Sequence, residues 1–382
     1  MKPKLIDVTL REGSQAADVY FTSRQRRAIL KGLAAVGIDE IEVGAVAKDA
    51  DMVGMVAEAR TLAPKARVAV WCRALCPDIE LAMACEPDVI SVSLPVSDLH
   101  LEKKMGRCRD WAIRQIDHVA RLVRLSGDIY LSLGLEDATR ADPQFLDELV
   151  CMAHAAGFDR IRIADTIGTA TPATVFNTVR RVLDRFPVSL GAHMHNDFGM
   201  ATANAITALN AGAEWADVSV GGVGERAGIA RLEELAGYLV LQQASRTYDL
   251  SELASLAAIV AEASGDTVAK RQPIIGDAIF SCESGLHLDG LDKEKATYEP
   301  FPPEAIGTTW HKRLSMKAGA NAVASVLKTN WANVGVEHVP AITARTRSVS
   351  RSFGRALTDT EFAAIVAEVA NQADTKPKSS PA

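Results

Sequence analysis

Eight short runs rich in β-branched residues alternate with helix-length amphipathic segments between Lys4 and Glu225. This alternation is typical of a parallel sheet whose strands are joined by crossover helices. Eight such units fit a closed (β/α)8 TIM barrel, whereas a doubly wound sheet more often has fewer units and a nucleotide-binding glycine turn. We therefore predict an α/β protein with a TIM barrel. The predicted strands are KLIDVTL from Lys4, DEIEVGA from Asp39, RVAVWCR from Arg67, VISVSLP from Val89, IYLSLGLE from Ile129, RIRIADT from Arg160, SLGAHMHND from Ser189 and ADVSVGGVGE from Ala216.

The first predicted crossover helix has recognisable signals at both ends. Its sequence is SRQRRAILKGLAAVG, in which Ser23 is a suitable N-cap and Gly37 a suitable C-terminal stop. A second helical stretch is predicted for residues 245–272, after the last strand.

The composition of the sequence changes after the predicted barrel. In residues 273–310, Pro, Gly and aromatic residues recur at short intervals, as expected of a linker or lid, and residues 315–370 are again helical in pattern. The tail ADTKPKSSPA is polar and contains proline, which predicts disorder. The predicted organisation is a TIM-barrel catalytic domain over 1–270, a linker, lid and helical C-terminal subdomain over 271–372, and a disordered tail over 373–382.

The composition argues against several classes of protein. A formal net charge of -6 gives no general attraction to nucleic acid or to an anionic membrane. The N-terminus lacks an apolar signal core, and no apolar run approaches the roughly 20 residues that span a bilayer. The six scattered cysteines favour reduced thiols over a disulfide framework. We therefore expect a cytoplasmic protein with small-molecule substrates, and no nucleic acid or membrane partner.

The carboxyl ends of the predicted strands are rich in polar residues. In a barrel these ends meet at one face, where the reactive groups of barrel enzymes lie. Apolar strands that turn polar at one common end are hard to explain by core packing. The polar residues concerned are Arg11, Glu12, Gln15, Arg73, Ser97, Asp98, His100, Glu136, Asp137, Asp165, Thr166, His193, His195, Glu225 and Arg226.

Three of these residues form a candidate metal site. A strand directs residues two apart to the same face, so His193 and His195 project together. Only the eighth strand separates the first strand from the seventh around a closed barrel, which brings Glu12 within reach of both histidines. One carboxylate and two imidazoles give a facial site with open positions for a divalent ion, water and substrate. Alternatively, Glu12 pairs with a neighbouring arginine and the histidines cap loops.

Several motifs in this order resemble one enzyme family. DVTLREGSQ, EDATRAD, ADTIG, HMHNDFGMATANA and GVGERAG are similar to motifs of the acyl-CoA Claisen-condensing synthases, which comprise isopropylmalate, citramalate and homocitrate synthases. ESGLHLDGL and TYEPFPPEAIG resemble their lid segment, so that the similarity covers roughly residues 4–310. WCRALC, SLPVSDL and EDATRAD look most like homocitrate synthase of the nitrogen-fixation type, whereas LREG and GERAGI resemble the lysine-biosynthesis type.

The resemblance implies a reaction and assigns roles to residues. Such enzymes chelate a 2-oxo acid to a divalent ion (Mg²⁺, Mn²⁺ or Zn²⁺), and the enolate of acetyl-CoA attacks the keto carbon. Glu12, His193 and His195 match the metal ligands, and Arg11 matches the arginine that steadies charge on the reacting oxygens. The remaining matches are His287 and Tyr298 for proton transfer, Glu136 near the acetyl group, and Thr166 and His100 at the substrate.

Some of these assignments have ordinary alternatives. Thr166 could cap the next turn, His100 could be a surface loop histidine, and Gln15, which could reach the 2-oxo acid, could be solvated. Arg73 or Arg162 could bind a distal substrate carboxylate, but either could instead make a salt bridge. In this family the appendage that bears the proton-transfer pair crosses onto a partner's barrel, which implies a homodimer with exchanged lids.

The chain also departs from the family pattern. Ile229 stands where many members have an asparagine close to the metal, so a fourth protein ligand is not expected. LSMKAGANAV, over residues 314–323, replaces the usual GKHSG stretch, and Ser14 replaces a usual acidic residue. These changes put the contribution of the 314–323 segment to the lid or to CoA binding in question.

The sequence therefore predicts an acyltransferase that condenses acetyl-CoA with 2-oxoglutarate to give homocitrate and CoA. The alternatives are another 2-oxo acid (2-oxoisovalerate, pyruvate, oxaloacetate or a phosphono analogue), a reverse-direction acyl-CoA lyase, or a non-catalytic barrel scaffold. Metal-dependent hydrolases on this barrel usually carry their His-x-His pair on the first strand, and this chain carries it on the seventh. The acyl-CoA lyases usually carry a cysteine in the glycine loop after strand eight, and GGVGERAGIARLEE has none.

Overall fold

The computed structural model describes residues 2–47, 51–246, 248–283, 287, 290–291 and 293–374. The chain divides into two compact units, residues 1–275 and residues 276–382. We refer to them as the barrel unit and the C-terminal unit.

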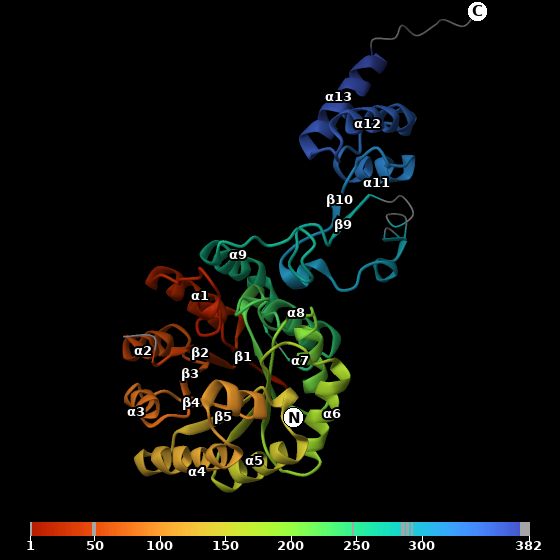
Figure 1. The fold of residues 1–382 in the computed structure, drawn as a ribbon. Helices are drawn as coiled ribbons and strands as arrows, with labels where there is room; N and C mark the ends of the chain where they lie inside the picture. Colours follow the sequence, from red (N-terminus) through yellow and green to blue (C-terminus); the bar gives the residue numbers. More distant parts are fainter. Residues whose placement is uncertain are drawn as a thin grey trace, which may run out of the picture. The chain divides into compact units, whose positions relative to one another are not determined.

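Eight parallel strands form a closed barrel in the barrel unit, with helices around its outside (Figure 1). Each strand pairs with the next along the chain, and β1 closes the ring by pairing with β8. The predicted TIM barrel is thus confirmed, and two predicted strands, β3 and β4, match their observed bounds. The strands are β1 (Lys4–Asp7), β2 (Glu40–Ala45), β3 (Arg67–Arg73), β4 (Val89–Pro95), β5 (Tyr130–Glu136), β6 (Arg160–Asp165), β7 (Leu190–Met194) and β8 (Trp215–Val218).

Helices follow the strands in sequence and bury one apolar face. In α1 the buried residues are Ile29, Leu30, Leu33 and Val36, which follow helical spacing. The helices of this unit are α1 (Ser23–Val36), α2 (Met52–Leu62), α3 (Cys76–Ala84), α4 (Arg109–Ser126), α5 (Pro143–Ala155), α6 (Pro172–Leu183), α7 (Ala201–Asn210), α8 (Leu232–Gly237) and α9 (Leu253–Ser264).

The ends of α1 correct one prediction and confirm another. Thr22, rather than Ser23, is the N-cap, because its side chain accepts from the backbone N–H of Gln25 while the Gln25 side chain accepts from the backbone of Thr22. Gly37 ends the helix with φ 84°, a left-handed conformation that glycine adopts without strain. The helix predicted over 245–272 is too long, since α9 covers only Leu253–Ser264.

The interior of the barrel contains buried charges as well as apolar side chains. Near the amino ends of the strands, Arg160 is fully enclosed and its guanidinium donates two hydrogen bonds to Glu40, at 2.6 and 3.0 Å. Arg160 also donates to Ser132 and lies over the ring of Trp215. Arg67 lies 3.8 Å from the same carboxylate, so the buried charges of Glu40 and Arg160 are paired within the protein.

The C-terminal unit has an irregular first part and a helical second part. Two short strands, β9 (Ser281–Cys282) and β10 (His311–Lys312), pair in parallel. Three helices then pack around an apolar cluster that includes Val323, Ile342 and Phe362. They are α11 (Ala320–Asn330), α12 (Val339–Phe353) and α13 (Asp359–Asp374). Residues 373 and 374 of the predicted tail therefore belong to a helix, and residues 375–382 lie outside the described residues.

Within the described part of the chain, no helix combines the length and the apolar character needed to cross a membrane. Five cysteines are free thiols, in line with the prediction of reduced cysteines: Cys72, Cys76, Cys85, Cys108 and Cys151.

Candidate metal centre

The candidate metal ligands come from two segments at the carboxyl ends of the strands. Glu12 lies in the turn after β1 and caps the short 3-10 helix Gly13–Gln15. His193 is the penultimate residue of β7, and His195 follows the strand. Gly224 packs against Glu12, where an added Cβ would come within 3.0 Å of the glutamate Cγ. A residue without a side chain is therefore needed there for Glu12 to keep its place.

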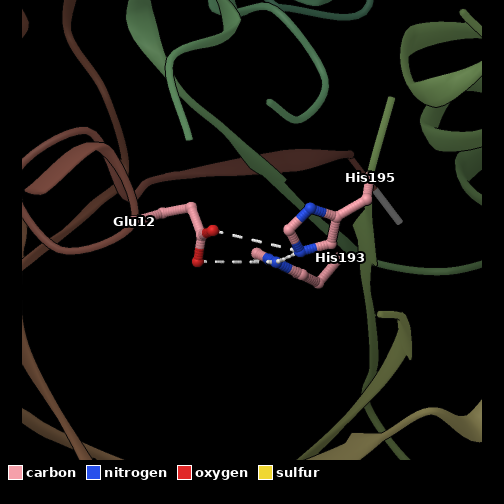
Figure 2. Close-up of side chains that lie close together, drawn as sticks. All are labelled: Glu12, His193 and His195. Carbon is pink, nitrogen blue, oxygen red and sulfur yellow. Dashed lines mark hydrogen bonds and ion pairs between the residues drawn. The ribbon is translucent and has the colours of Figure 1, made fainter. Parts of the chain in front are cut away.

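The three side chains converge on one point (Figure 2). The two Nε2 atoms are 3.2 Å apart, and they lie 3.9 Å and 4.0 Å from the carboxylate oxygens of Glu12. Ligand atoms that share one ion at about 2.1 Å are separated by roughly 3.0–3.4 Å. All three residues are buried, and their donor atoms lie within 4.8 Å of one another. The three side chains therefore fit a divalent ion, as predicted, once the distances from Glu12 to the two histidines shorten slightly.

Electrostatics keep two of these donors, Glu12 and His195, unprotonated. Burial by itself would raise the pKa of Glu12, but the guanidinium of Arg11 and the two histidines lower it to about 2. Burial lowers the pKa of His195 to about 3, and the neighbouring His193 lowers it further. At neutral pH the site thus offers a carboxylate and a neutral imidazole, the forms that bind metals.

Buried ion pairs support two of the ligands. Arg11 donates to Glu12 through Nη1 and to Glu42 through Nε, the latter at 2.5 Å. His193 faces Asp217, with Nδ1 2.7 Å from a carboxylate oxygen. Burial opposes ionisation of Asp217, but Arg162 and His193 outweigh it and lower its pKa to about 2. A carboxylate behind a histidine is the usual way in which proteins orient a metal-ligating imidazole.

A second polar group lies at the ends of β4 and β5. The Nδ1 atom of His100 is 3.0 Å from Glu136, and Lys104 contacts the same carboxylate oxygen at 2.5 Å. Next to them, the hydroxyl of Thr166 accepts from the backbone N–H of Asp137 at 2.8 Å. The structure thus brings His100 and Glu136 together.

Two predicted substrate contacts have partners within the protein. Gln15 accepts a long hydrogen bond, 3.4 Å, from Arg11 and so lies beside the candidate metal centre. Arg73 is 56% exposed and makes a two-point ion pair with Asp78, with distances of 2.7 and 2.9 Å. The guanidinium of Arg73 would have to leave Asp78 to bind a substrate.

The predicted proton-transfer pair belongs to the C-terminal unit. The rings of His287 and Tyr298 pack together with their centroids 4.2 Å apart. Five residues of the predicted lid motif around His287, residues 284–286 and 288–289, lie outside the described residues.

Sequence reasoning missed several residues of this region. Asp217 and Glu42 were not singled out, and neither was Lys104. The available signal was a charged residue at alternate positions within an otherwise apolar strand, as in EIEVGA and WADVSV. Such a position faces the barrel interior, where a charge needs a partner.

The family asparagine position is apolar here, as the sequence shows. Ile229 is buried against Ile6, Val8 and Trp215, and it bridges to His195 through the backbone. This residue contributes to the barrel wall and offers no side-chain ligand.

A cavity of about 490 Å³ lies beside the glycine loop of residues 220–228. One side of this loop contacts Glu12, because Glu225 donates its backbone N–H to that carboxylate at 3.2 Å. The cavity wall combines apolar and polar groups. Among the lining residues are Ala16, Val19, Gly222, Val260, Ser264 and Gln272.

Comparison with known proteins gives two family matches. Residues 2–260 match the HMGL-like family, and residues 274–352 match the homocitrate synthase post-HMGL domain-like family. The first match covers more than half of the chain and contains all three candidate metal ligands.

Individual relatives extend over nearly the whole chain. A protein named 2-isopropylmalate synthase 2 of Caldanaerobacter subterraneus subsp. tengcongensis is 33% identical, over 96% of this chain and 95% of its own. A homocitrate synthase of Frankia alni is 36% identical, over 85% of this chain and 93% of its own. The crystal structure of an HMG-CoA lyase from Bacillus subtilis has a TM-score of 0.62 at 21% identity, covering 71% of this chain and 96% of its own, and supports the fold alone.

Proposed function

The chain belongs to the HMGL-like family, and from this premise we propose that it condenses acetyl-CoA with 2-oxoglutarate to give homocitrate and CoA at a divalent-metal centre. The observation that carries the proposal is the convergence of Glu12, His193 and His195 beside the fixed guanidinium of Arg11. Within the family, the sequence motifs favour the nitrogen-fixation type of homocitrate synthase. We place the reaction in the cytoplasm and in a homodimer.

The three ligands would hold the ion on one face only. A divalent ion held there supplies a Lewis acid that polarises a chelated 2-oxo acid. The guanidinium of Arg11 is fixed because its Nε donates to Glu42 and its Nη1 donates to Glu12. A fixed cation in a buried site stabilises charge that develops on a reacting oxygen, and one such donor can contribute about 2.7–4 kcal/mol.

Two further groups would serve the thioester. The cavity beside the glycine loop combines apolar and polar surface, which suits the amide-containing arm of acetyl-CoA, and the same loop contacts Glu12 through the backbone of Glu225. Glu136, with His100 and Lys104 on its carboxylate, would lie near the acetyl group. In this proposal His287 and Tyr298 move the methyl proton, and they reach the barrel of a partner subunit, as the family resemblance implies.

The identity of the 2-oxo acid depends on which cation binds its distal carboxylate. Arg162 is committed to buried carboxylates, at 2.8 Å from Asp217 and 3.4 Å from Glu42. We therefore assign the distal carboxylate of 2-oxoglutarate to Arg73, with Gln15 and Thr166 closer to the keto acid. The relative named isopropylmalate synthase supports the alternative in which the acceptor is 2-oxoisovalerate.

A CoA-release assay tests the proposal. The metal-loaded protein is incubated with acetyl-CoA and each of 2-oxoglutarate, 2-oxoisovalerate, pyruvate, oxaloacetate and a phosphono analogue, with Mg²⁺, Mn²⁺ or Zn²⁺, and free thiol is measured. The highest kcat/KM is expected for 2-oxoglutarate. A higher value for another acid would reassign the substrate. Cleavage of a hydroxyacyl-CoA without any condensation would favour the reverse lyase, and no turnover at all would favour a scaffold.

A further inference from the structure

The buried charges around the candidate metal centre form one connected chain that begins and ends at a metal ligand. Each contact joins opposite charges or a charge and an imidazole, and every member is at most 6% exposed. We call it the charge chain. In order, its members are Glu12, Arg11, Glu42, Arg162, Asp217 and His193.

Asp217 is the last carboxylate of this chain, and it determines which nitrogen of His193 carries hydrogen. Arg162 Nη1 lies 2.8 Å from Oδ2 of Asp217, the same oxygen that faces His193, and an oxygen that receives an arginine N–H acts as a hydrogen-bond acceptor. The His193 Nδ1 atom, 2.7 Å away, must therefore donate, which leaves the lone pair on Nε2. Nε2 is the atom that faces His195 and Glu12.

The second histidine lacks such support. The Nδ1 atom of His195 is buried and has no hydrogen-bond partner among the described residues. Its Nε2 atom lies 3.2 Å from that of His193. When no ion is bound, Nε2 of His195 can therefore donate a hydrogen bond to the lone pair on Nε2 of His193. The two imidazoles are thus inequivalent, although they lie two residues apart at the end of β7 and face the same point.

We propose that Asp217 is a positioning residue that fixes the tautomer and the ring orientation of His193, and so makes His193 the stronger of the two imidazole ligands. The inference rests on one part of the proposed function, the binding of a divalent ion by Glu12, His193 and His195, and it does not depend on the condensation reaction. Asp217 touches neither ion nor substrate in this scheme, because it acts through His193. A purely structural role of Asp217 would instead require only that it neutralise Arg162.

The test is the metal affinity of Asp217→Asn. The asparagine amide can donate to Nδ1 and so favour the tautomer with hydrogen on Nε2, which cannot bind a metal. Apoprotein is titrated with Mn²⁺ or Zn²⁺ against a chromophoric chelator, with no acetyl-CoA or 2-oxo acid present. We expect affinity to fall roughly 10–100-fold.

Glu40→Gln is the matched control. Glu40 is also a fully buried carboxylate that is paired with an arginine inside the barrel, and it contacts Arg160 instead of a metal ligand. Both substitutions are expected to lower stability, but only Asp217→Asn should weaken metal binding. Equal metal affinity of the wild type and Asp217→Asn, or an equal loss in Glu40→Gln, would overturn the proposal.

A second measurement needs no variant. The nitrogen chemical shifts of ¹⁵N-histidine in the wild-type apoprotein report the tautomer of His193, assigned by its loss in His193→Gln. We expect hydrogen on Nδ1. Hydrogen on Nε2 would overturn the proposal even if Asp217→Asn fails to fold. A wild type that binds ions but does not condense acetyl-CoA would contradict the proposed function and leave this result standing.

Discussion

Two layers of buried charge lie inside the same barrel, and they differ in what they leave unpaired. In the lower layer, Arg160 and Glu40 satisfy each other with two hydrogen bonds, and Ser132 and Trp215 enclose the pair. In the upper layer, two Nε2 atoms and a carboxylate converge, with their donor atoms within 4.8 Å of one another. Arg11 also donates to the carboxylate of Glu12. Buried charge alone therefore does not identify a functional site, whereas converging acceptors do.

The largest effect is expected from removing a ligand in the upper layer. Glu12→Ala or His193→Ala should abolish binding of a divalent ion at micromolar concentration and lower kcat/KM by at least about 1000-fold, because a metal's Lewis-acid contribution amounts to several kcal/mol. Isothermal titration with Mn²⁺ and the CoA-release assay measure both quantities. Retention of metal binding by either variant would show that the upper layer, like the lower one, is only structural.

The lower layer should respond in stability and not in metal binding. Arg160→Ala leaves the buried carboxylate of Glu40 with only the longer ion pair to Arg67, at 3.8 Å, and loss of a buried partner typically costs about 3–5 kcal/mol. Urea denaturation measures the change in the free energy of unfolding. Affinity for the ion should remain within about threefold of the wild type, since Arg160 contacts none of the three ligands. A large loss of affinity for the ion would contradict this expectation and show that the two layers function together.

Metal removal should affect the two layers unequally. A ligand that binds only the folded state stabilises it by about 2.7 kcal/mol at 100 times its Kd. Chelation with EDTA should therefore lower the midpoint of thermal unfolding of the wild type and of Glu40→Gln by the same amount, and should leave Glu12→Ala unchanged. Scanning calorimetry with and without Mn²⁺ checks this expectation. A shift in Glu12→Ala would place the stabilising ion elsewhere.

The contrast between the layers also shows what a sequence can reveal. Strand and helix alternation is local, so all eight strands were predicted, and the common polar end of parallel strands located Glu12, His193 and His195. The identity of a cap depends on one side-chain rotamer, which is why Ser23 was chosen instead of Thr22.

Partnerships across the barrel are harder to predict. Asp217 and Arg162 are far apart in the sequence, and only the closed barrel brings them to 2.8 Å. The position of Arg73 on Asp78 depends on where α3 begins. These contacts are set by tertiary geometry that no local pattern encodes.

Another buried carboxylate, Glu233, belongs to neither layer, and among the described residues it has no arginine within ion-pair distance and no converging ligands. One of its oxygens accepts from Gly221 N–H at 2.8 Å, and the other has no partner among the described residues. Burial raises its pKa from 4.5 to about 7. Below about pH 4.5 the carboxyl group is protonated in both the folded and the unfolded chain, so it imposes no penalty. As the pH rises from about 4.5 to 7, the unfolded chain loses this proton first, and the stability of the fold declines.

Glu233→Gln should remove this decline. The side-chain carbonyl of glutamine can still accept from Gly221, and the amide carries no charge to bury. We expect the variant to nearly equal the wild type at or below pH 4.5 and to exceed it by roughly 3 kcal/mol well above pH 7, where the difference levels off. Urea denaturation at several pH values measures this divergence. A constant difference across the range would mean that Glu233 is ionised in the fold and is stabilised by a partner, as Glu40 is.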